Sequence, residues 1–312
     1  MPENDRKLVS FDWAIKRLLR SKANFEVLEG FLSELLYKDV KILQVLESES
    51  NQEDGGDKYN RVDVKVEDST GEIIIIEVQF NDELDFMHRI LYSASKTICE
   101  HMRLGESFSK VVKVISVNIL YFNLGEGDDY IYKGTTTFNG MHNNSVLKLN
   151  EEQRRTFNKE YPSEIYPEFY IIKVDNFNDI ATSTLDQWVY LLKNSAVKPG
   201  FKAKGIEKAN EVLDIMKMTK EERLSYEHFM ENMAIGRSWE RTAEIKGEMR
   251  GISIGREEGI AIGREEGIAI GKLEAMKNMI GLLSEMGMKK DAIKEKIKLK
   301  FDLSEDEIKL IL

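Results

Sequence analysis

Two carboxylic acids, Asp63 and Glu77, stand fourteen positions apart in two segments that have the patterns of β-strands. Glu77 directly follows four isoleucines, residues 73–76, and is followed in turn by Val78 and Gln79. Carboxylate oxygens and backbone carbonyls are the ligands that a hard cation such as Mg²⁺ prefers. If the two acids converge in the fold, these residue types predict a metal site where a strand ends.

The two segments that carry these acids have the patterns of paired strands. Residues 61–66 alternate polar and apolar side chains, which is typical of a half-buried strand. The isoleucine run is typical of a strand buried on both faces, because β-branched side chains fit a pleated interior. A polar segment with one glycine, residues 67–72, separates the two. The pattern therefore predicts a β-hairpin with Asp63 and Glu77 at one end of a sheet.

Side chains alternate across a strand, so Glu77 and Gln79 are expected on one face and Val78 on the other. On the hairpin alone, two interpretations stay open. Either the acids converge on a metal ion, or they are solvated carboxylates at a strand end, with Asp63 on the wet face of the sheet.

Four segments of the chain together carry a family resemblance. They are residues 11–16 (FDWAIK), 58–63 (KYNRVD), 77–79 (EVQ) and 89–96 (RILYSASK), within roughly residues 8–125. An aspartate that precedes an apolar strand ending in an acid is similar to the PD-(D/E)XK nuclease pattern. More narrowly, the chain resembles the PD-(D/E)XK nuclease family transposases, the recombination-promoting nuclease group. Gln79 stands where the wider superfamily has a lysine, and the narrower group is known to use glutamine there.

The resemblance implies a DNA endonuclease that hydrolyses phosphodiester bonds with Mg²⁺ (or Mn²⁺) and is associated with transposition or recombination. It implies that Asp63, Glu77 and the carbonyl of Val78 hold the metal, which polarises a phosphoryl oxygen and lowers the pKa of a bound water. Gln79 is expected to orient that water, although a glutamine cannot supply the positive charge of a lysine. A further acid of the superfamily usually comes from the first core helix, and Glu29 is the candidate here.

The composition limits the class of protein. The 312 residues carry a net charge of −10, and 42% of them are apolar, as in a folded globular protein. No segment approaches the ~20 apolar residues of a membrane span, and the charged amino terminus lacks the apolar stretch of a signal peptide, so the protein is expected to be cytoplasmic. A single cysteine, Cys99, excludes an internal disulfide and a cysteine-rich zinc site. The acidic charge argues against nonspecific adhesion to nucleic acid, so DNA binding requires a local basic face.

A basic face is expected on the helix that follows the hairpin, at about residues 83–105. Apolar residues recur there every four positions. The substrate-binding residues predicted on this helix are Arg89, Tyr92, Ser93, Lys96 and Arg103. Its three basic residues are seven positions apart, so each repeats within about 20° of the last around the helix. The alternative is an ordinary solvated helix surface.

The remaining apolar patterns complete one fold class. They predict helices at 11–19 and 24–36, and strands at 40–46, 111–122, 130–138 and 169–174. A polar helix is expected at 151–160. The order of helix, three strands, helix and strand is that of a restriction-endonuclease-like α/β core, with a mixed central sheet flanked by helices and an α-helical C-terminal extension.

Four regions are expected: a nuclease-like domain at 1–180, a helical region at 181–236, a glycine-rich repeat at 237–281 and a small helical segment at 282–312. The repeat recurs every eight residues, with glycine at every fourth position from 247 to 271. A strand is an alternative, but the helical flanks favour one long helix. Small residues at this spacing let two helices approach closely, so the repeat is expected to make the protein a homo-oligomer.

Three functions remain open from the sequence. An active DNA endonuclease is favoured by the intact Asp63 and Glu77. A catalytically idle nuclease fold, which acts as an interaction module through its repeats, is favoured by Gln79 and by the acidic charge. A nuclease that acts on RNA is the third, since nothing in the chain excludes it. No base-reading motif is visible, so the sequence predicts no cut-site preference.

Overall fold

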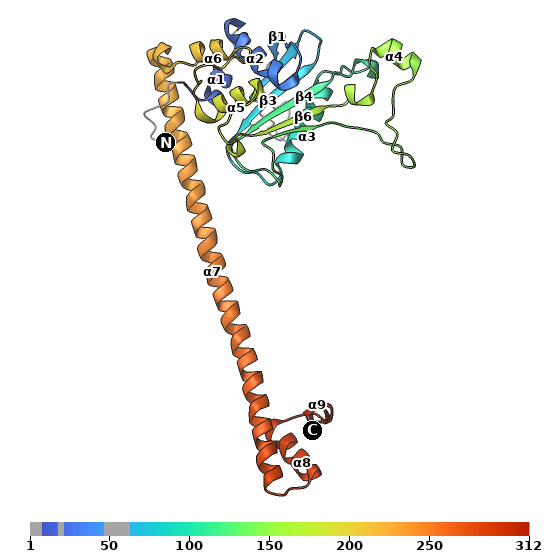
Figure 1. Ribbon diagram of the computed structural model, residues 1–312, viewed down its shortest axis with the longest axis vertical. Helices are drawn as coiled ribbons and strands as arrows, with labels where there is room; N and C mark the ends of the chain where they lie inside the picture. Colours follow the sequence, from blue (N-terminus) through green and yellow to red (C-terminus); the bar gives the residue numbers. More distant parts are fainter. Residues whose placement is uncertain (1–7, 18–21, 47–62, 312) are drawn as a thin grey trace. The chain divides into compact units, whose positions relative to one another are not determined.

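The computed structural model describes residues 8–17, 22–46 and 63–311 (Figure 1). Residues 18–19 and 58–62, on which two of the predicted segments fall, lie outside the described residues. The chain divides into two compact units, residues 1–229 and 230–312. The helices of the predicted region 181–236 therefore fall mostly in the first unit.

The first unit contains a six-stranded sheet, with the strands in the order β1-β2-β3-β4-β6-β5. The strands are β1 (Ile42–Leu46), β2 (Val64–Asp68), β3 (Ile73–Gln79), β4 (Val114–Leu120), β5 (Ile131–Gly134) and β6 (Glu168–Lys173). Strands β3, β4 and β6 run parallel to one another, whereas β1–β2, β2–β3 and β5–β6 are antiparallel pairs. The sheet is mixed, as the sequence predicts.

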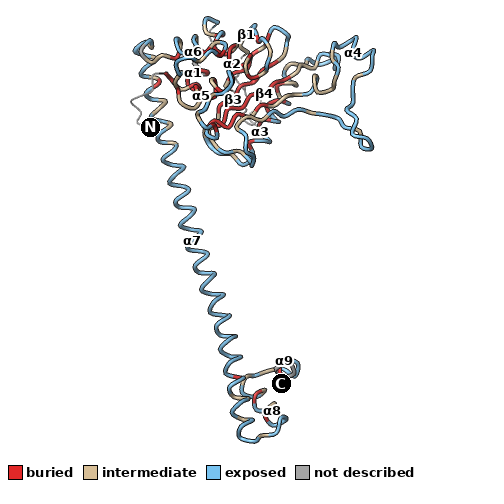
Figure 2. Tube along the Cα trace, viewed as in Figure 1, coloured by how far each residue is buried: buried red, intermediate tan, exposed pale blue. Residues whose placement is uncertain are grey.

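Helices cover both faces of this sheet. Those of the first unit are α1 (Phe11–Arg17), α2 (Phe25–Leu36), α3 (Phe86–Glu100), α4 (Glu151–Phe157), α5 (Thr184–Asn194) and α6 (Ile206–Val212). Helix α3 lies on one face, and α1, α2 and α5 lie on the other (Figure 1). Aromatic contacts of Phe31 with Phe11 and Trp188 join these last three helices. Figure 2 shows that the buried residues of this unit concentrate in the central strands and the helices beside them.

The isoleucine run of β3 is buried on both faces of the sheet. Ile73 and Ile75 pack with Ala94 of α3 on one face. Ile74 and Ile76, which alternate with them, point to the other face and are fully buried. Both faces of β3 are therefore covered along the isoleucine run, and Glu77 is the first polar side chain of the strand.

Helix α2 and the segment before α6 approach closely at two glycines. A Cβ atom on Gly30 would lie 2.3 Å from the carbonyl oxygen of Lys204 and 2.7 Å from the Cα atom of Gly205. Gly205 has a φ of 75°, a conformation that other residues adopt at a cost. The indole of Trp188 in α5 donates a hydrogen bond to the same Lys204 oxygen at 3.1 Å. Helices α2, α5 and α6 therefore form one layer.

We expect Gly30→Ala to lower the free energy of unfolding by about 2 kcal/mol, because backbone atoms cannot move aside as a flexible side chain would. Gly281→Ala in α7 (Lys220–Glu285) is a control, because nothing lies within 4 Å of the Cβ position there. Helix propensity should make that variant neutral or more stable. Chemical denaturation followed by circular dichroism measures both, and an equal effect of the two substitutions would contradict the close approach.

The second unit contains most of α7 and two short helices, α8 (Lys290–Phe301) and α9 (Glu305–Ile311). Its small core includes Met276, Ile293, Ile297 and Ile308. A capping box precedes α9, because Ser304 Oγ accepts the Glu307 N–H at 3.3 Å and Glu307 Oε2 accepts the Ser304 N–H at 2.8 Å. In the described part of the chain, no helix is long and apolar enough to cross a membrane.

Some predicted boundaries differ from the structure. The helix predicted at 83–105 is shorter, since α3 ends at Glu100 and Gly105 has a φ of 88°. The strand predicted at 130–138 ends at Gly134. The helical region predicted at 181–236 is divided into α5, α6 and the start of α7. The octad repeat is helical throughout, as predicted.

Candidate active site

The hairpin of β2 and β3 places the two predicted acids at the same end of the sheet. Val64 pairs with Ile76 in an antiparallel register, and the next position on each strand sets Asp63 opposite Glu77. The backbone N–H of Val78 donates a hydrogen bond to Asp63 Oδ2 at 2.7 Å. Asp63 is therefore fixed against β3, beside Glu77.

The backbone of Val78 offers a further oxygen at this end. In a β-strand the N–H and C=O of one residue leave on the same side, and the N–H of Val78 points to Asp63. The Val78 carbonyl therefore lies on the Asp63 side of β3. Among residues 8–17, 22–46 and 63–311, no three histidine, cysteine or acidic side chains form a metal cluster. Two carboxylates with carbonyl and amide oxygens are nevertheless an all-oxygen set that fits Mg²⁺ or Mn²⁺.

The Glu77 carboxylate is nearly buried, with 7% of its side chain exposed, and forms an ion pair with Nη2 of Arg89 in α3. The same nitrogen lies 3.2 Å from Gln79 Oε1. The other terminal nitrogen, Nη1, donates to Glu83 Oε1 at 2.8 Å. One guanidinium therefore joins the two polar side chains at the end of β3 to Glu83.

Gln79 is held in the same network. Its Nε2 donates to Glu83 Oε1 at 3.1 Å and to the carbonyl of Asn81 at 3.2 Å. Since a guanidinium only donates, the Gln79 amide oxygen must face Arg89, which fixes the orientation of the amide. Glu83 was missed from the sequence, although its position between the strand and the next helix was a usable signal.

Asn118 of β4 lies beside Glu77, with which it pairs in the parallel register. It is fully buried, and its Nδ2 donates to Ser116 Oγ at 3.0 Å and to the carbonyl of Tyr170 at 3.1 Å. A carbonyl only accepts, so the Nδ2 must face Tyr170. Asn118 Oδ1 then has no hydrogen-bond partner among the described residues. This oxygen was missed from the sequence, although a serine and an asparagine in an otherwise apolar strand are a visible signal.

The other predicted substrate-binding residues do not form one exposed stripe. Ser93 is buried, with only 1% of its surface exposed. Arg103 lies beyond the end of α3. Lys96 is partly exposed and Tyr92 is exposed. Arg89 and Lys96 therefore keep the seven-residue spacing on α3, although Arg89 turns to Glu77, whereas Arg103 falls outside the helix because the helix ends first.

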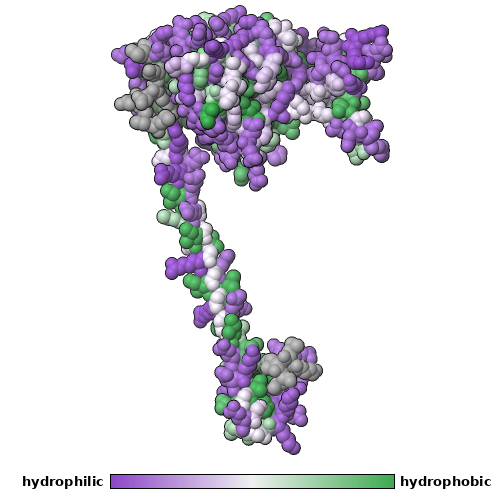
Figure 3. All heavy atoms as spheres, viewed as in Figure 1, coloured by the Kyte–Doolittle hydropathy of each residue, from purple (hydrophilic) through white to green (hydrophobic). Residues whose placement is uncertain are grey.

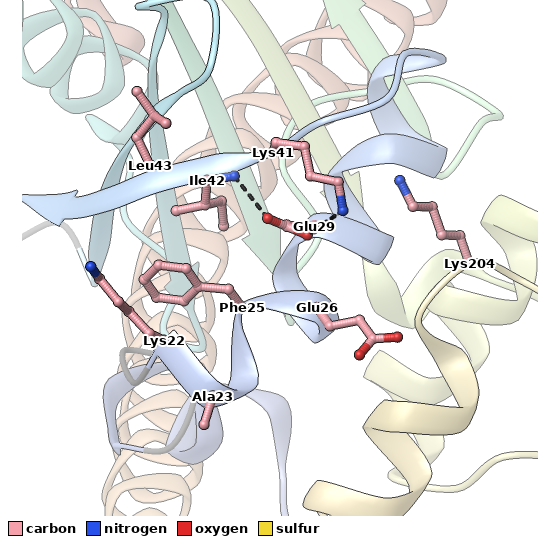
Figure 4. Close-up of a pocket in the computed structure, with 9 residues that line it drawn as sticks. All are labelled: Lys22, Ala23, Phe25, Glu26, Glu29, Lys41, Ile42, Leu43 and Lys204. Atoms are coloured by element: carbon pink, nitrogen blue, oxygen red, sulfur yellow. Dashed lines mark hydrogen bonds and ion pairs between the residues drawn. The ribbon is translucent and has the colours of Figure 1, made fainter.

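Glu29, the predicted additional acid, lies at the opposite end of the sheet. Its Oε1 accepts the backbone N–H of Ile42 at 2.9 Å, and its Oε2 pairs with Lys41 at 2.9 Å (Figure 4). Ile42 pairs with Asp68, at the end of β2 away from Asp63. Glu29 therefore holds the start of β1 and lines a cavity of about 560 Å³, and the structure does not bring it to the acids of the hairpin.

Comparison with known proteins identifies the family. A family model described as PD-(D/E)XK nuclease family transposase matches residues 9–235, which is more than two thirds of the chain. Neither the curated proteins nor the solved structures gave a match. The matched span includes the entire sheet, the Asp63–Glu77 hairpin and α3. The chain therefore belongs to the PD-(D/E)XK nuclease family transposases.

Proposed function

We propose that the protein is a metal-dependent endonuclease that hydrolyses phosphodiester bonds in DNA, in transposition or recombination, with Mg²⁺ or Mn²⁺ as its cofactor. The observation that supports it most is the position of Asp63 at the end of the β2–β3 hairpin, next in register to Glu77 and hydrogen-bonded to the Val78 N–H. Membership of a nuclease family supports the same reaction class, since PD-(D/E)XK nucleases generally use divalent metals.

Asp63, Glu77 and the Val78 carbonyl would hold the ion, with Asn118 Oδ1 as a further oxygen on the same face. When bound, a divalent ion supplies a Lewis acid for the phosphoryl oxygen and a hydroxide near neutral pH. The chain itself orients the donors: the Val78 N–H fixes Asp63, and burial restricts the motion of Glu77. Gln79 would position a water with its amide, if the hydrogen bonds to Glu83 and Arg89 rearrange when substrate binds.

The direct test is nicking of supercoiled plasmid with Mg²⁺, compared with the same reaction in EDTA, with an RNA of similar length assayed in parallel. We expect cleavage of DNA only when the metal is present. Cleavage of RNA alone would assign the protein to the RNA-directed alternative. No cleavage of either substrate would favour the idle interaction module.

DNA binding by an acidic protein requires local positive charge, and Lys96 with Arg103 would supply part of it. We expect the double variant Lys96→Gln, Arg103→Gln to flatten the slope of log affinity against log salt concentration by about two, since each phosphate contact contributes about 0.9. Filter binding or fluorescence anisotropy over a salt series measures the slope. The control is the double variant Lys290→Gln, Lys296→Gln, because these two exposed lysines lie in the second unit and their replacement changes the net charge by the same amount. An unchanged slope in the variant of Lys96 and Arg103 would mean that these two side chains do not contact phosphates and belong to the ordinary solvated surface.

We also propose that the repeat at 237–281 makes the protein a homo-oligomer. Its isoleucines are exposed along α7, with 57% to 64% of their surface accessible at residues 252, 254, 260, 262, 268 and 270. Figure 3 shows hydrophobic residues, in green, exposed along α7 among hydrophilic ones, in purple. An oligomer would bring two active sites to one duplex, so that both strands are cut.

A further inference from the structure

The end of β3, where Glu77 lies, lacks a cation of its own, because Gln79 is a neutral amide. In the structure a positive charge reaches this position from another element. Arg89, in the second turn of α3, pairs with Glu77 and lies 3.2 Å from Gln79 Oε1. The cation that a lysine would place on β3 is therefore placed by the helix that follows it.

We propose that Arg89 is a catalytic residue with two successive partners. Without metal it neutralises Glu77 and so competes with the ion for that carboxylate. With metal and DNA bound, its guanidinium binds an oxygen of the scissile phosphate and supplies the positive charge that Gln79 lacks. This inference rests on the proposed function of the Asp63–Glu77 site.

The contacts of Arg89 allow such an exchange because they use different nitrogens. Nη2 binds Glu77, whereas Nη1 binds Glu83 Oε1 at 2.8 Å. The ring of Phe86 also lies beneath the guanidinium, with its centroid 4.8 Å from Cζ. When Nη2 leaves Glu77, the side chain keeps two anchors. It therefore does not have to leave the site in order to change partner.

The exposure of these groups gives the exchange a direction. The side chain of Glu77 is 7% exposed, whereas those of Arg89 and Glu83 are 27% and 32% exposed. The guanidinium thus lies between a buried carboxylate and solvent, the side from which a phosphate must arrive. A planar guanidinium can bind two oxygens of one phosphate, which a single ammonium group cannot do with the same geometry.

Arg89 Nη2 contacts one oxygen of the Glu77 carboxylate, Oε1. An ion bound to the same carboxylate repels the guanidinium, so an ion that takes Oε1 displaces Nη2. Removing the guanidinium should therefore strengthen metal binding and weaken catalysis at the same time. A residue that only stabilises the site would behave differently: its loss would loosen the metal ligands and weaken both.

The test is a titration of the metal-free full chain with Mn²⁺, followed by electron paramagnetic resonance, together with nicking rates at saturating metal. In Arg89→Gln we expect Mn²⁺ to bind about tenfold more tightly, while the single-turnover rate falls by about 10²–10³-fold, as for the loss of one donor to a transition-state oxygen. Arg89→Lys should keep an affinity near that of the unaltered protein and lose about tenfold in rate. Arg155→Gln is the matched control, because Arg155 forms an exposed ion pair with Glu151 on α4 and carries the same charge.

Weaker or unchanged Mn²⁺ binding in Arg89→Gln would overturn the inference, as would a full rate at saturating metal. If Arg89→Gln does not fold by circular dichroism, the rate of Arg89→Lys decides, and a full rate in that variant rejects the phosphate contact. Failure of the proposed function is distinguishable, because the unaltered protein would then bind Mn²⁺ no better than Glu77→Gln does. If binding depends on Glu77 and Arg89→Gln leaves it unchanged, only the role of Arg89 is rejected.

Discussion

Replacement of Glu77 by glutamine is expected to lower the rate of DNA nicking at least about 10³-fold and to leave the fold intact. The substitution keeps the shape of the side chain but removes the charge that would hold the metal. A metal ion contributes several kcal/mol to the stabilisation of a phosphoryl transition state, and each 1.36 kcal/mol corresponds to about a factor of ten. The near-complete burial of this carboxylate leaves little room for water to take its place.

Asp63→Asn should lower the nicking rate by a similar factor. This substitution removes the negative charge but keeps the hydrogen bond that fixes the side chain. An amide oxygen can still accept the hydrogen bond from the Val78 N–H, which Asp63 Oδ2 now accepts at 2.7 Å. The hairpin end should therefore keep its geometry while the second negative charge is lost. Single-turnover nicking of supercoiled plasmid in Mg²⁺ measures the loss, and far-ultraviolet circular dichroism checks the fold.

Glu72→Gln is a suitable control for both variants. Glu72 lies at the opposite end of the same hairpin, where it pairs with Lys38. Its replacement breaks an ion pair and removes one negative charge, as the active-site changes do, but it should leave nicking unaltered. If the double variant of Asp63 and Glu77 still nicks DNA at the full rate, the nuclease assignment of this site is wrong.

The hairpin and its sheet were predictable because they follow from local periodicity. Four isoleucines require cover on both faces, and the structure supplies it with α3 on one side and the layer of α1, α2 and α5 on the other. The alternation that leads to Asp63 sets the antiparallel partner of this strand. These patterns span only a few residues each, so a single sequence is enough to read them.

The other parts of the site depend on register and on helix ends, which the sequence does not specify locally. Asn118 becomes a neighbour of Glu77 only because β4 pairs with β3 in one particular register. Glu29 lies on the helix predicted at 24–36, but its carboxylate contacts the sheet at the end opposite the two acids. Arg103 has the expected spacing, yet α3 ends before it. The direction of the Arg89 side chain, inward to Glu77, depends on how α3 packs on the sheet.

The helix formed by the eight-residue repeat is expected to hold the oligomer together through its glycines. Alanine at Gly255, Gly259, Gly263 and Gly267 should convert the protein from a dimer or larger oligomer to a monomer. Within one chain nothing lies within 4 Å of the Cβ positions of these glycines, so the chain's own packing does not require them. In an isolated helix each substitution should instead add up to ~1 kcal/mol of helix stability. Because these glycines lower the stability of the helix and no contact within the chain needs them, we expect another part of the assembly to fill the space beside them.

That space is suited to a second copy of the helix. An α-helix turns by 100° per residue, so glycine at every fourth position drifts by about 40° per step and forms a stripe that winds around the axis. The isoleucines remain exposed, but they lie on several sides of the axis, because two residues that are two positions apart in a helix are about 200° apart around it. The glycine stripe is therefore the feature on which we expect the second helix to pack. Small residues along a winding stripe let two helices cross closely, and an added methyl group at each crossing would keep them apart.

Size-exclusion chromatography with light scattering measures the mass of the full chain, of the four-alanine variant and of a chain that ends at Ser238. We expect an oligomer for the first and monomers for the other two at micromolar concentration. Gly281→Ala lies in the same helix outside the octads and should leave the mass unchanged, so it separates a general gain of helix stability from loss of an interface. The negative ellipticity at 222 nm should become larger in magnitude in the four-alanine variant, which would show that the helix itself is intact. If the full chain is already a monomer, the repeat is a tether or spacer, and each active site must cut its strand alone.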